Sequence, residues 1–446
     1  MKRISLPFAL LALSVILWNC KDDDNPGPDL SSSTISFLWD FTATGNNTFY
    51  AVVSDTSGTV LKWDEIVPGT QLDLPYPPNG ELATVTLITR ASNQSGHATF
   101  LNTFTGLKPG KYTVKPDADA DPAEKDGTFK FGILNPSEDF QFLAQYMTGT
   151  YEYIDVSNKD KDYTYNYGVY NGAVNNLFVW GTTDGTRQII KYKYFEGVSA
   201  NDSLGVSKES FENEFGVMPY HNITYPGLAQ SLSAEFYVTG ITNSGGSIDI
   251  DARLFSSGSE AKLAYPDIAG LFPQYQTLVS SINDNGNSFY EKNTSQNPDL
   301  NFSNLEATLE KVYKITTKRI AADVSGDGEI VYIEKQFGTS SDPLVYFVYA
   351  PIVSSKVRMN LPQFPQELMD KLANLARIKE EQSFDILYVD EYNMSYTDFF
   401  DFYVGNNLFG YPPNMRSKGF AVEGGARMSA GTYTMPERFK AKKLDL

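Results

Sequence analysis

The sequence predicts a mainly β protein, and three observations lead to that prediction. Short segments rich in Val, Ile, Thr, Tyr and Phe recur along the chain. Gly, Pro, Asn and Asp separate them, as tight turns require. Helical periodicity is restricted to a few short stretches, the clearest of which runs from Pro365 to Glu381. We therefore expect an N-terminal Ig-like or prealbumin-like β-sandwich, followed by a larger β-dominated region with a few short helices.

Residues 1–19 have the pattern of a secretory signal peptide. Lys2 and Arg3 form a basic head, and an apolar run of 15 residues follows from Ile4 to Trp18. This run is shorter than the roughly 20 residues that a helix needs to span a bilayer. We therefore expect residues 1–19 to be removed during export.

Cys20 follows the apolar run directly and is the only cysteine in 446 residues. With Leu17 three positions before it, the segment Leu17–Cys20 resembles the lipobox of bacterial lipoproteins, in which the cysteine thiolate accepts a diacylglyceryl group. The next four residues resemble the Lys-plus-acidic export tag of Bacteroidota surface lipoproteins: Lys21, Asp22, Asp23 and Asp24. The resemblance implies a lipid anchor in the outer membrane and exposure at the cell surface, with a periplasm-facing position as the alternative. Without lipidation, the segment would be an ordinary cleaved leader followed by a solvated linker.

Residues 20–33 are predicted to be a linker, because Pro, Gly and Ser dominate after the acidic run. Residues 34–116 then form the expected sandwich, with seven short strands. These strands are predicted at 35–41, 49–54, 60–63, 71–74, 83–90, 98–104 and 111–115.

The stretch Gly106–Val114 carries the strongest signal for the sandwich. Pro109 and Gly110 favour a turn, and Tyr112 is placed to fill the corner of a sandwich. The stretch resembles the final strand of fibronectin-III-like and carboxypeptidase-regulatory-like (prealbumin-like) domains. The resemblance implies a spacer domain more than a catalytic one.

An acidic linker is expected at residues 117–127, and a larger region, of no family that we recognise, at residues 128–446. Asp184-Gly185 indicates a hairpin between two alternating segments. Short helices are expected within Ser207–Phe215, Tyr265–Ile282 and Pro365–Glu381. Gly, Asn and Ser accumulate in Ser281–Ser295, so we expect a division into two domains near residues 260–300.

Composition excludes several classes of function. The formal net charge is −18, and it becomes −20 once Lys2 and Arg3 leave with the leader, so nucleic acid is disfavoured as a partner. After acylation of Cys20 no thiol remains for a disulfide or a thiolate metal site. The chain has only two histidines, which argues against a multi-histidine metal centre.

Residues 323–334 fit the twelve-residue spacing of a calcium loop and resemble those of EF-hands and dockerins. The candidate oxygen ligands are Asp323, Ser325, Asp327, Glu329 and Glu334. The flanking segments have the pattern of strands, whereas an EF-hand needs helices. The alternative interpretation is therefore a tight hairpin turn at Ser325–Gly328, without metal.

The residue types favour binding over catalysis. We find no nucleophile elbow, no phosphate-binding loop and no dinucleotide fingerprint. Aromatic residues make up 14% of the chain, which suits stacking on a ligand such as a glycan. We therefore expect a non-catalytic surface lipoprotein that binds a glycan or a surface protein. The alternatives are an envelope glycoside hydrolase with an Asp/Glu pair, and a structural or adhesive surface protein.

Overall fold

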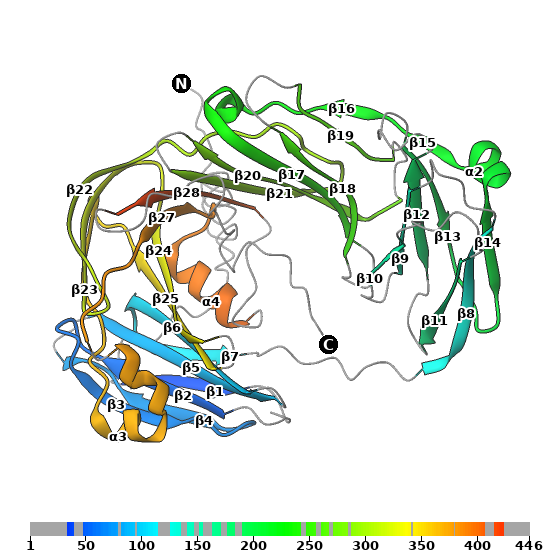
Figure 1. The fold of residues 1–446 in the computed structure, drawn as a ribbon. Helices are drawn as coiled ribbons and strands as arrows, with labels where there is room; N and C mark the ends of the chain where they lie inside the picture. Colours follow the sequence, from blue (N-terminus) through cyan, green and yellow to red (C-terminus); the bar gives the residue numbers. More distant parts are fainter. Residues whose placement is uncertain are drawn as a thin grey trace, which may run out of the picture.

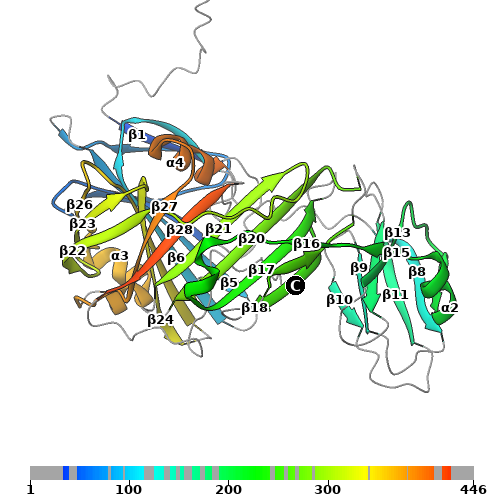
Figure 2. The same cartoon turned by 90° about the horizontal axis from the view of Figure 1, so that it is seen from above.

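The computed structural model shows a protein built from mostly antiparallel β-sheets, as the sequence predicts (Figures 1 and 2). None of the helices that the structure describes is long and apolar enough to cross a lipid bilayer. The structure describes residues 34–39, 48–78, 82–93, 96–114, 125–134, 141–146, 151–154, 163–170, 176–182, 190–241, 247–255, 260–266, 271–283, 287–339, 342–378, 380–405 and 414–422.

The first seven strands divide between two sheets that share one core, which confirms the expected sandwich. β1, β4 and β7 form a three-stranded sheet, while β2, β3, β5 and β6 belong to a twelve-stranded sheet. Phe37 and Tyr112 of the small sheet pack in the same core as Phe49 and Phe104 of the large one. The strands span Thr34–Trp39 (β1), Thr48–Ser54 (β2), Val60–Glu65 (β3), Gln71–Pro75 (β4), Ala83–Asn93 (β5), Gly96–Leu107 (β6) and Gly110–Val114 (β7).

Tyr112 fills the corner of the sandwich, where the sequence placed it. Its hydroxyl donates a hydrogen bond of 2.9 Å to the backbone carbonyl of Lys108. Its ring meets that of Phe400 edge-on, with centroids 4.8 Å apart. Burial raises the pKa of the Tyr112 phenol, so the group stays neutral and keeps its hydrogen bond.

The twelve-stranded sheet continues beyond the boundary expected at residue 116. β6 pairs in parallel with β25, where Tyr349 lies opposite Phe104 and their rings stack 4.9 Å apart. The next neighbours across the sheet are β24, β27 and β28. Residues 34–114 therefore share their core with residues 330–415, including helix α4. These elements span Ile330–Thr339 (β24), Asp342–Pro351 (β25), Ile386–Glu391 (β27), Tyr396–Gly405 (α4) and Met415–Ala421 (β28).

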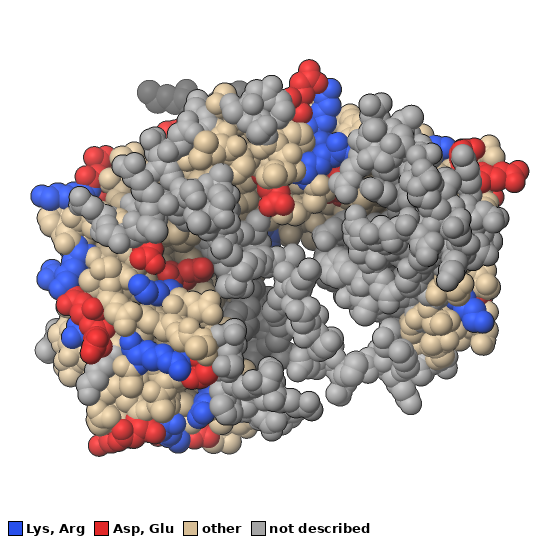
Figure 3. Space-filling model, viewed as in Figure 1, with Lys and Arg blue, Asp and Glu red and all other residues tan. Residues whose placement is uncertain are grey.

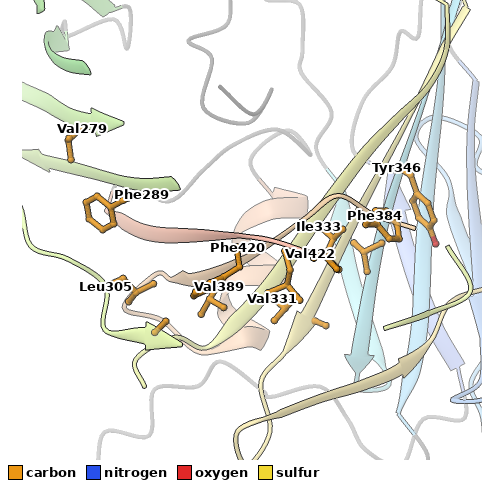
Figure 4. Close-up of a cluster of buried hydrophobic side chains, with 14 of the residues drawn as sticks. Val279, Phe289, Leu305, Val331, Ile333, Tyr346, Phe384, Val389, Phe420 and Val422 are labelled. Carbon is orange, nitrogen blue, oxygen red and sulfur yellow. The ribbon is translucent and has the colours of Figure 1, made fainter. Parts of the chain in front are cut away.

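β28 joins the two halves of the large sheet. It pairs with β27 on one side and with β21 on the other, and the sheet continues through β20, β17 and β18. Figure 4 shows a row of buried apolar side chains across this junction, from Phe289 through Val389 and Val331 to Tyr346. The outer strands span Ser231–Ile241 (β17), Ser247–Phe255 (β18), Gln274–Asn283 (β20) and Ser288–Ser295 (β21).

Residues 125–218 form two smaller sheets at the far end of the molecule (Figure 2). Phe129, Val179 and Phe211 belong to their common core. Phe272, which precedes β20, meets the ring of Phe178 edge-on at 6.0 Å and connects this unit to the large sheet. The elements span Lys125–Leu134 (β8), Gln141–Tyr146 (β9), Tyr151–Ile154 (β10), Tyr163–Tyr170 (β11), Leu177–Thr182 (β12), Ile190–Phe195 (β13), Ser203–Ser207 (β14), Lys208–Glu214 (α2) and Gly216–Met218 (β15).

The remaining elements flank the large sheet. β16 and β19 form a two-stranded ribbon, and β22, β23 and β26 form a three-stranded antiparallel sheet. The elements span Tyr220–Asn222 (β16), Pro226–Gln230 (η2), Lys262–Ala264 (β19), Ala307–Ile315 (β22), Arg319–Gly326 (β23), Lys356–Asn360 (β26), Gln366–Lys371 (α3) and Ala373–Ile378 (η3).

The predicted helices have mixed outcomes. α2 is confirmed, and the Ser207 hydroxyl caps it by accepting a hydrogen bond from the backbone N–H of Ser210. The helix expected within Tyr265–Ile282 is wrong, because residues 274–283 form β20 with its alternating burial. The helix expected from Pro365 to Glu381 is divided into α3 and the 3₁₀ helix η3.

The two predicted hairpins also differ. The strands expected on either side of Asp184-Gly185 pair in antiparallel register as β12 and β13, while Asp184 and Gly185 lie outside the described residues. The hairpin at Ser325–Gly328 is wrong, because β23 pairs with β22 and β26, whereas β24 pairs with β25 and β27. The segment instead passes from one sheet to the other. Gly326 has a φ of +90°, and a Cβ there would lie 1.8 Å from the carbonyl oxygen of Glu306, so only glycine fits.

Candidate functional site

The predicted anchor lies outside the described residues. Cys20 and the acidic run Lys21–Asp24 fall in this part of the chain. The same holds for most of the predicted acidic linker at residues 117–127. Lipidation and surface export therefore stay predictions.

The first two candidate calcium ligands bind neighbouring side chains on the three-stranded sheet. Asp323 accepts hydrogen bonds from the Arg358 guanidinium and, at 2.9 Å, from the Tyr313 hydroxyl. The Arg358 hydrogen bond is the main cause that lowers the pKa of the Asp323 carboxyl. Ser325 donates its hydroxyl hydrogen to Glu310. These two residues are therefore already engaged in contacts within the protein.

The other three candidate calcium ligands do not share a common set of neighbours. The Asp327 backbone N–H donates to the carbonyl of Glu306 at 2.6 Å. Burial, followed by the nearby charge of Glu391, raises the pKa of Glu329. Glu334 accepts a hydrogen bond from the Tyr332 hydroxyl on the same strand. Among the described residues, no group of three or more His, Cys, Asp or Glu side chains is arranged to hold a metal ion.

A ladder of charged side chains crosses the junction at β28. Arg416 lies opposite Glu291 of β21 on one side and opposite Glu391 of β27 on the other. Its guanidinium forms an ion pair with Glu391 that lacks the geometry of a directed hydrogen bond. Burial is the main cause that raises the pKa of Glu291, although its carboxylate accepts hydrogen bonds from Asn293 and Ser303.

Asp390 forms the next rung of this ladder, on the opposite face of the sheet. Its side chain is fully buried. One carboxylate oxygen accepts from the Ser417 hydroxyl at 2.6 Å, and the other accepts from the Tyr392 hydroxyl at 2.7 Å. Asp390 therefore holds β27 to β28.

A cavity of about 300 Å³ lies beside this junction, between η2, the β20–β21 hairpin and β28. We call it the polar cavity. Its volume is at the lower end for small-molecule sites, which run from about 300 to 1,000 Å³. It is lined by Tyr225, Gly227, Ser231, Ser281, Asn283, Asn287, Ser288, Phe289, Asn304, Leu305, Glu306 and Lys418.

Two aromatic rings form one wall of the polar cavity. Tyr225 and Phe289 stack with centroids 5.4 Å apart and planes inclined by 17°. The Tyr225 hydroxyl shares a hydrogen bond of 2.6 Å with Ser281, and burial raises its pKa to about 12. A Cβ at Gly227 would come within 2.5 Å of the Tyr225 ring, so the glycine leaves space for this wall.

The rest of the lining is polar. The side-chain amides of Asn287 and Asn304 have no hydrogen-bond partner among the described residues, while Asn283 accepts from the Asn287 backbone N–H at 3.0 Å. Lys418 is engaged, since its ammonium donates to the carbonyl of Ala307. Within this lining the single carboxylate is that of Glu306, which is exposed.

This arrangement suits a neutral ligand rich in hydroxyl groups. An amide can both donate and accept, so two free amides can bind neighbouring hydroxyls. A glycoside hydrolase needs two carboxyl groups at the bond that it cleaves, whereas this lining offers one. The rings of Tyr392, Phe399, Phe400 and Tyr403 are buried in the core between the sheets and α4, so they do not line a sugar groove.

The comparisons with known proteins give no family. No family model and no curated protein matches the sequence. Among solved structures, a tetra-tandem repeat from the extending region of a large adhesion protein matches with 9% identity and a TM-score of 0.13, over 80% of this chain and 94% of that one. Salmonella alpha-2-macroglobulin reacted with methylamine matches with 10% identity and a TM-score of 0.11, over 77% of this chain and 27% of that one. Scores this low carry no argument about function.

Sequence reasoning did not identify the residues of the polar cavity. The signal was present in Ser281–Ser295, where Asn and Ser accumulate, but it was interpreted as a domain boundary. In the structure, β20 and β21 pair on both sides of this stretch, from Ile282 opposite Ser288 to Tyr275 opposite Ser295. The polar residues near the turn face a cavity.

Proposed function

We propose that the mature chain is a lipid-anchored binding protein of the outer membrane, exposed at the cell surface, whose polar cavity holds a neutral ligand rich in hydroxyl groups, such as a short glycan. The lipobox-like Leu17–Cys20 and the acidic run after it support the location. The cavity supports the binding function. The protein performs no chemistry on its ligand in this proposal.

One observation carries the binding function: two unpaired amides face a cavity whose other wall is aromatic. Both amides are half-buried, so a ligand in the cavity can bind them directly in place of solvent. A bound hydroxyl group would satisfy Asn287 and Asn304. Tyr225 and Phe289, each only 8% exposed, line the same cavity and add a small apolar surface beside the amides.

A glycan array with the purified mature chain, followed by calorimetry on the bound glycans, tests the proposal. Asn304→Ala should weaken binding about tenfold, because a hydrogen bond to the ligand is lost. Asn166→Ala, at an exposed position of β11, is the matched control and should leave the affinity unchanged. No binding to any glycan, or equal affinity for the Asn304→Ala variant, would contradict the proposal.

The same samples test the enzymatic alternative. We expect the glycans that bind to be recovered intact after long incubation, as seen by chromatography. Cleavage that Glu306→Gln abolishes would show that the cavity is an active site instead.

The anchor needs a separate experiment. A labelled lipid precursor should enter the wild-type protein in cells and should not enter Cys20→Ala. Equal labelling of both proteins would exclude Cys20 as the acylated residue. This result would not contradict the proposal that the polar cavity binds a ligand.

A further inference from the structure

Basic side chains gather on the three-stranded sheet of β22, β23 and β26, although the chain as a whole carries a formal charge of −18. The three strands, with the turn between β22 and β23, contain six Lys or Arg residues and two Asp or Glu residues. Figure 3 shows Lys and Arg side chains at the left-hand edge, where Figure 1 places β22 and β23, with acidic side chains between them.

The strand register brings four of these cations to one face, which we call the cationic face: Lys311, Lys314, Lys356 and Arg358. Lys311 and Lys356 flank Asp323 in one row across the three strands, and Lys314 and Arg358 flank Ala321 in the next. Residues directly opposite each other, or two apart on one strand, point to the same side of a sheet. Four cations therefore lie around the carboxylate of Asp323, and two further carboxylates, those of Glu310 and Glu381, reach Ser325 and Lys314 of the same face.

Two cations of this face have no carboxylate partner. Arg358 pairs with Asp323, and Lys314 pairs with Glu381 at 2.6 Å. Lys311 and Lys356 form no ion pair with any described residue. Lys311 lies 4.7 Å from the ring centre of Tyr313, which is 53% exposed. The face therefore keeps an excess of positive charge that is open to solvent.

A second cavity, of about 260 Å³, opens beside the cationic face. We call it the β26 cavity, because Lys356, Arg358 and Asn360 of that strand all line it. Its other walls include Leu82, which is 45% exposed, and Val353, which is 64% exposed. Ser354 and Ser355 both have positive φ, in the tight turn that holds Val353 at the rim.

We propose that the cationic face and the β26 cavity together bind an acidic polysaccharide, with carboxylate groups at Lys311 and Lys356 and the apolar side of one sugar ring against Leu82 and Val353. An anionic ligand is favoured because the two lysines are exposed and form no close ion pair with a described residue, although Asp323 lies between them. A carbohydrate is favoured because polar and apolar surface alternate over a short distance, as they do on a sugar ring. This site is separate from the polar cavity, and it does not depend on the function proposed there.

Binding of oligogalacturonate to the mature chain, measured by calorimetry at low salt, tests this proposal. Lys356→Glu should weaken binding about tenfold or more, since it replaces an attraction by a repulsion. Lys130→Glu, at an exposed position of β8, changes the net charge equally and should have less than a twofold effect. Affinity should fall as NaCl rises from about 50 to 500 mM, because salt screens exposed charges.

Two further measurements separate the sources of an anionic group. The methyl-esterified oligomer, which has the same backbone without the charge, should bind much more weakly. Vesicles with anionic phospholipid should not compete with oligogalacturonate. Vesicle binding without oligogalacturonate binding would overturn the proposal, as would equal effects of Lys356→Glu and Lys130→Glu. Asn304→Ala should leave oligogalacturonate binding intact. The proposals for the polar cavity and for the cationic face are therefore tested separately.

Discussion

Two polar regions border β28, and they differ in whether their side chains have partners. At Arg416 and Ser417 the carboxylates of the adjacent strands meet an ion pair or a hydroxyl donor. At Lys418 the polar cavity begins, and the amides of Asn287 and Asn304 meet no described partner. Polar groups in the first region therefore stabilise the junction of the sheet, whereas those in the second are available to a ligand. Substitutions should therefore change stability in the first region and binding in the second.

Arg416→Met should have the largest effect on stability. The Glu291 and Glu391 carboxylates would lose the cation that lies between them. Glu291 is buried, and removing the cation beside a buried carboxylate leaves its charge uncompensated, so we expect a loss of about 3 kcal/mol in unfolding free energy. Equilibrium unfolding in urea measures this change in unfolding free energy. Unchanged stability would show that the ladder does not hold the two halves together.

Asp390→Ala should have the second largest effect. Two buried hydroxyls, those of Ser417 and Tyr392, would lose their acceptor. We expect a loss of about 2 kcal/mol, which is close to the value for a hydrogen bond to a charged group. Asp385→Ala, at an exposed position just before β27, serves as the control in the same urea experiment. If both variants lost the same stability, the buried contacts would not be the cause.

The pH dependence of the junction should be smaller than the effect of either substitution. Burial raises the folded-state pKa of Glu291 above its ordinary value of 4.5, so the folded protein binds more protons than the unfolded chain just above pH 4.5. The contribution of Glu291 to stability therefore grows as pH falls from 7 towards 4.5. The unfolding free energy of the wild type minus that of Glu291→Gln should therefore increase as pH falls from 7 towards 4.5. A difference that shrinks over this range would contradict the assigned shift.

Asn304→Ala should have the smallest effect on stability, below about 0.5 kcal/mol, because its amide loses no hydrogen bond to a described residue. Thermal unfolding without ligand measures this value. A loss comparable to that of Asp390→Ala would place Asn304 with the structural residues of the junction. The comparison between the two regions would then fail.

Local features of this fold were predictable, while long-range pairing was not. The strands of residues 34–116 follow from short alternating segments, and Tyr112 follows from its turn. The parallel pairing of β6 with β25 joins residues more than 200 positions apart, and no local pattern encodes it. The same reason explains why residues 323–334 resemble a calcium loop on spacing alone, although their two strands belong to different sheets. The polar cavity was missed because its lining comes from four separate segments.

The central claim is that unpaired amides in the polar cavity bind a ligand. The most direct measurement is the NMR spectrum of side-chain amides in protein labelled with ¹⁵N-asparagine, recorded while a glycan found by the array is added. We predict that the resonances of Asn287 and Asn304, assigned through their alanine variants, shift with saturation, while that of Asn166 stays in place. Saturable binding of the glycan with no shift at either cavity residue would contradict the claim.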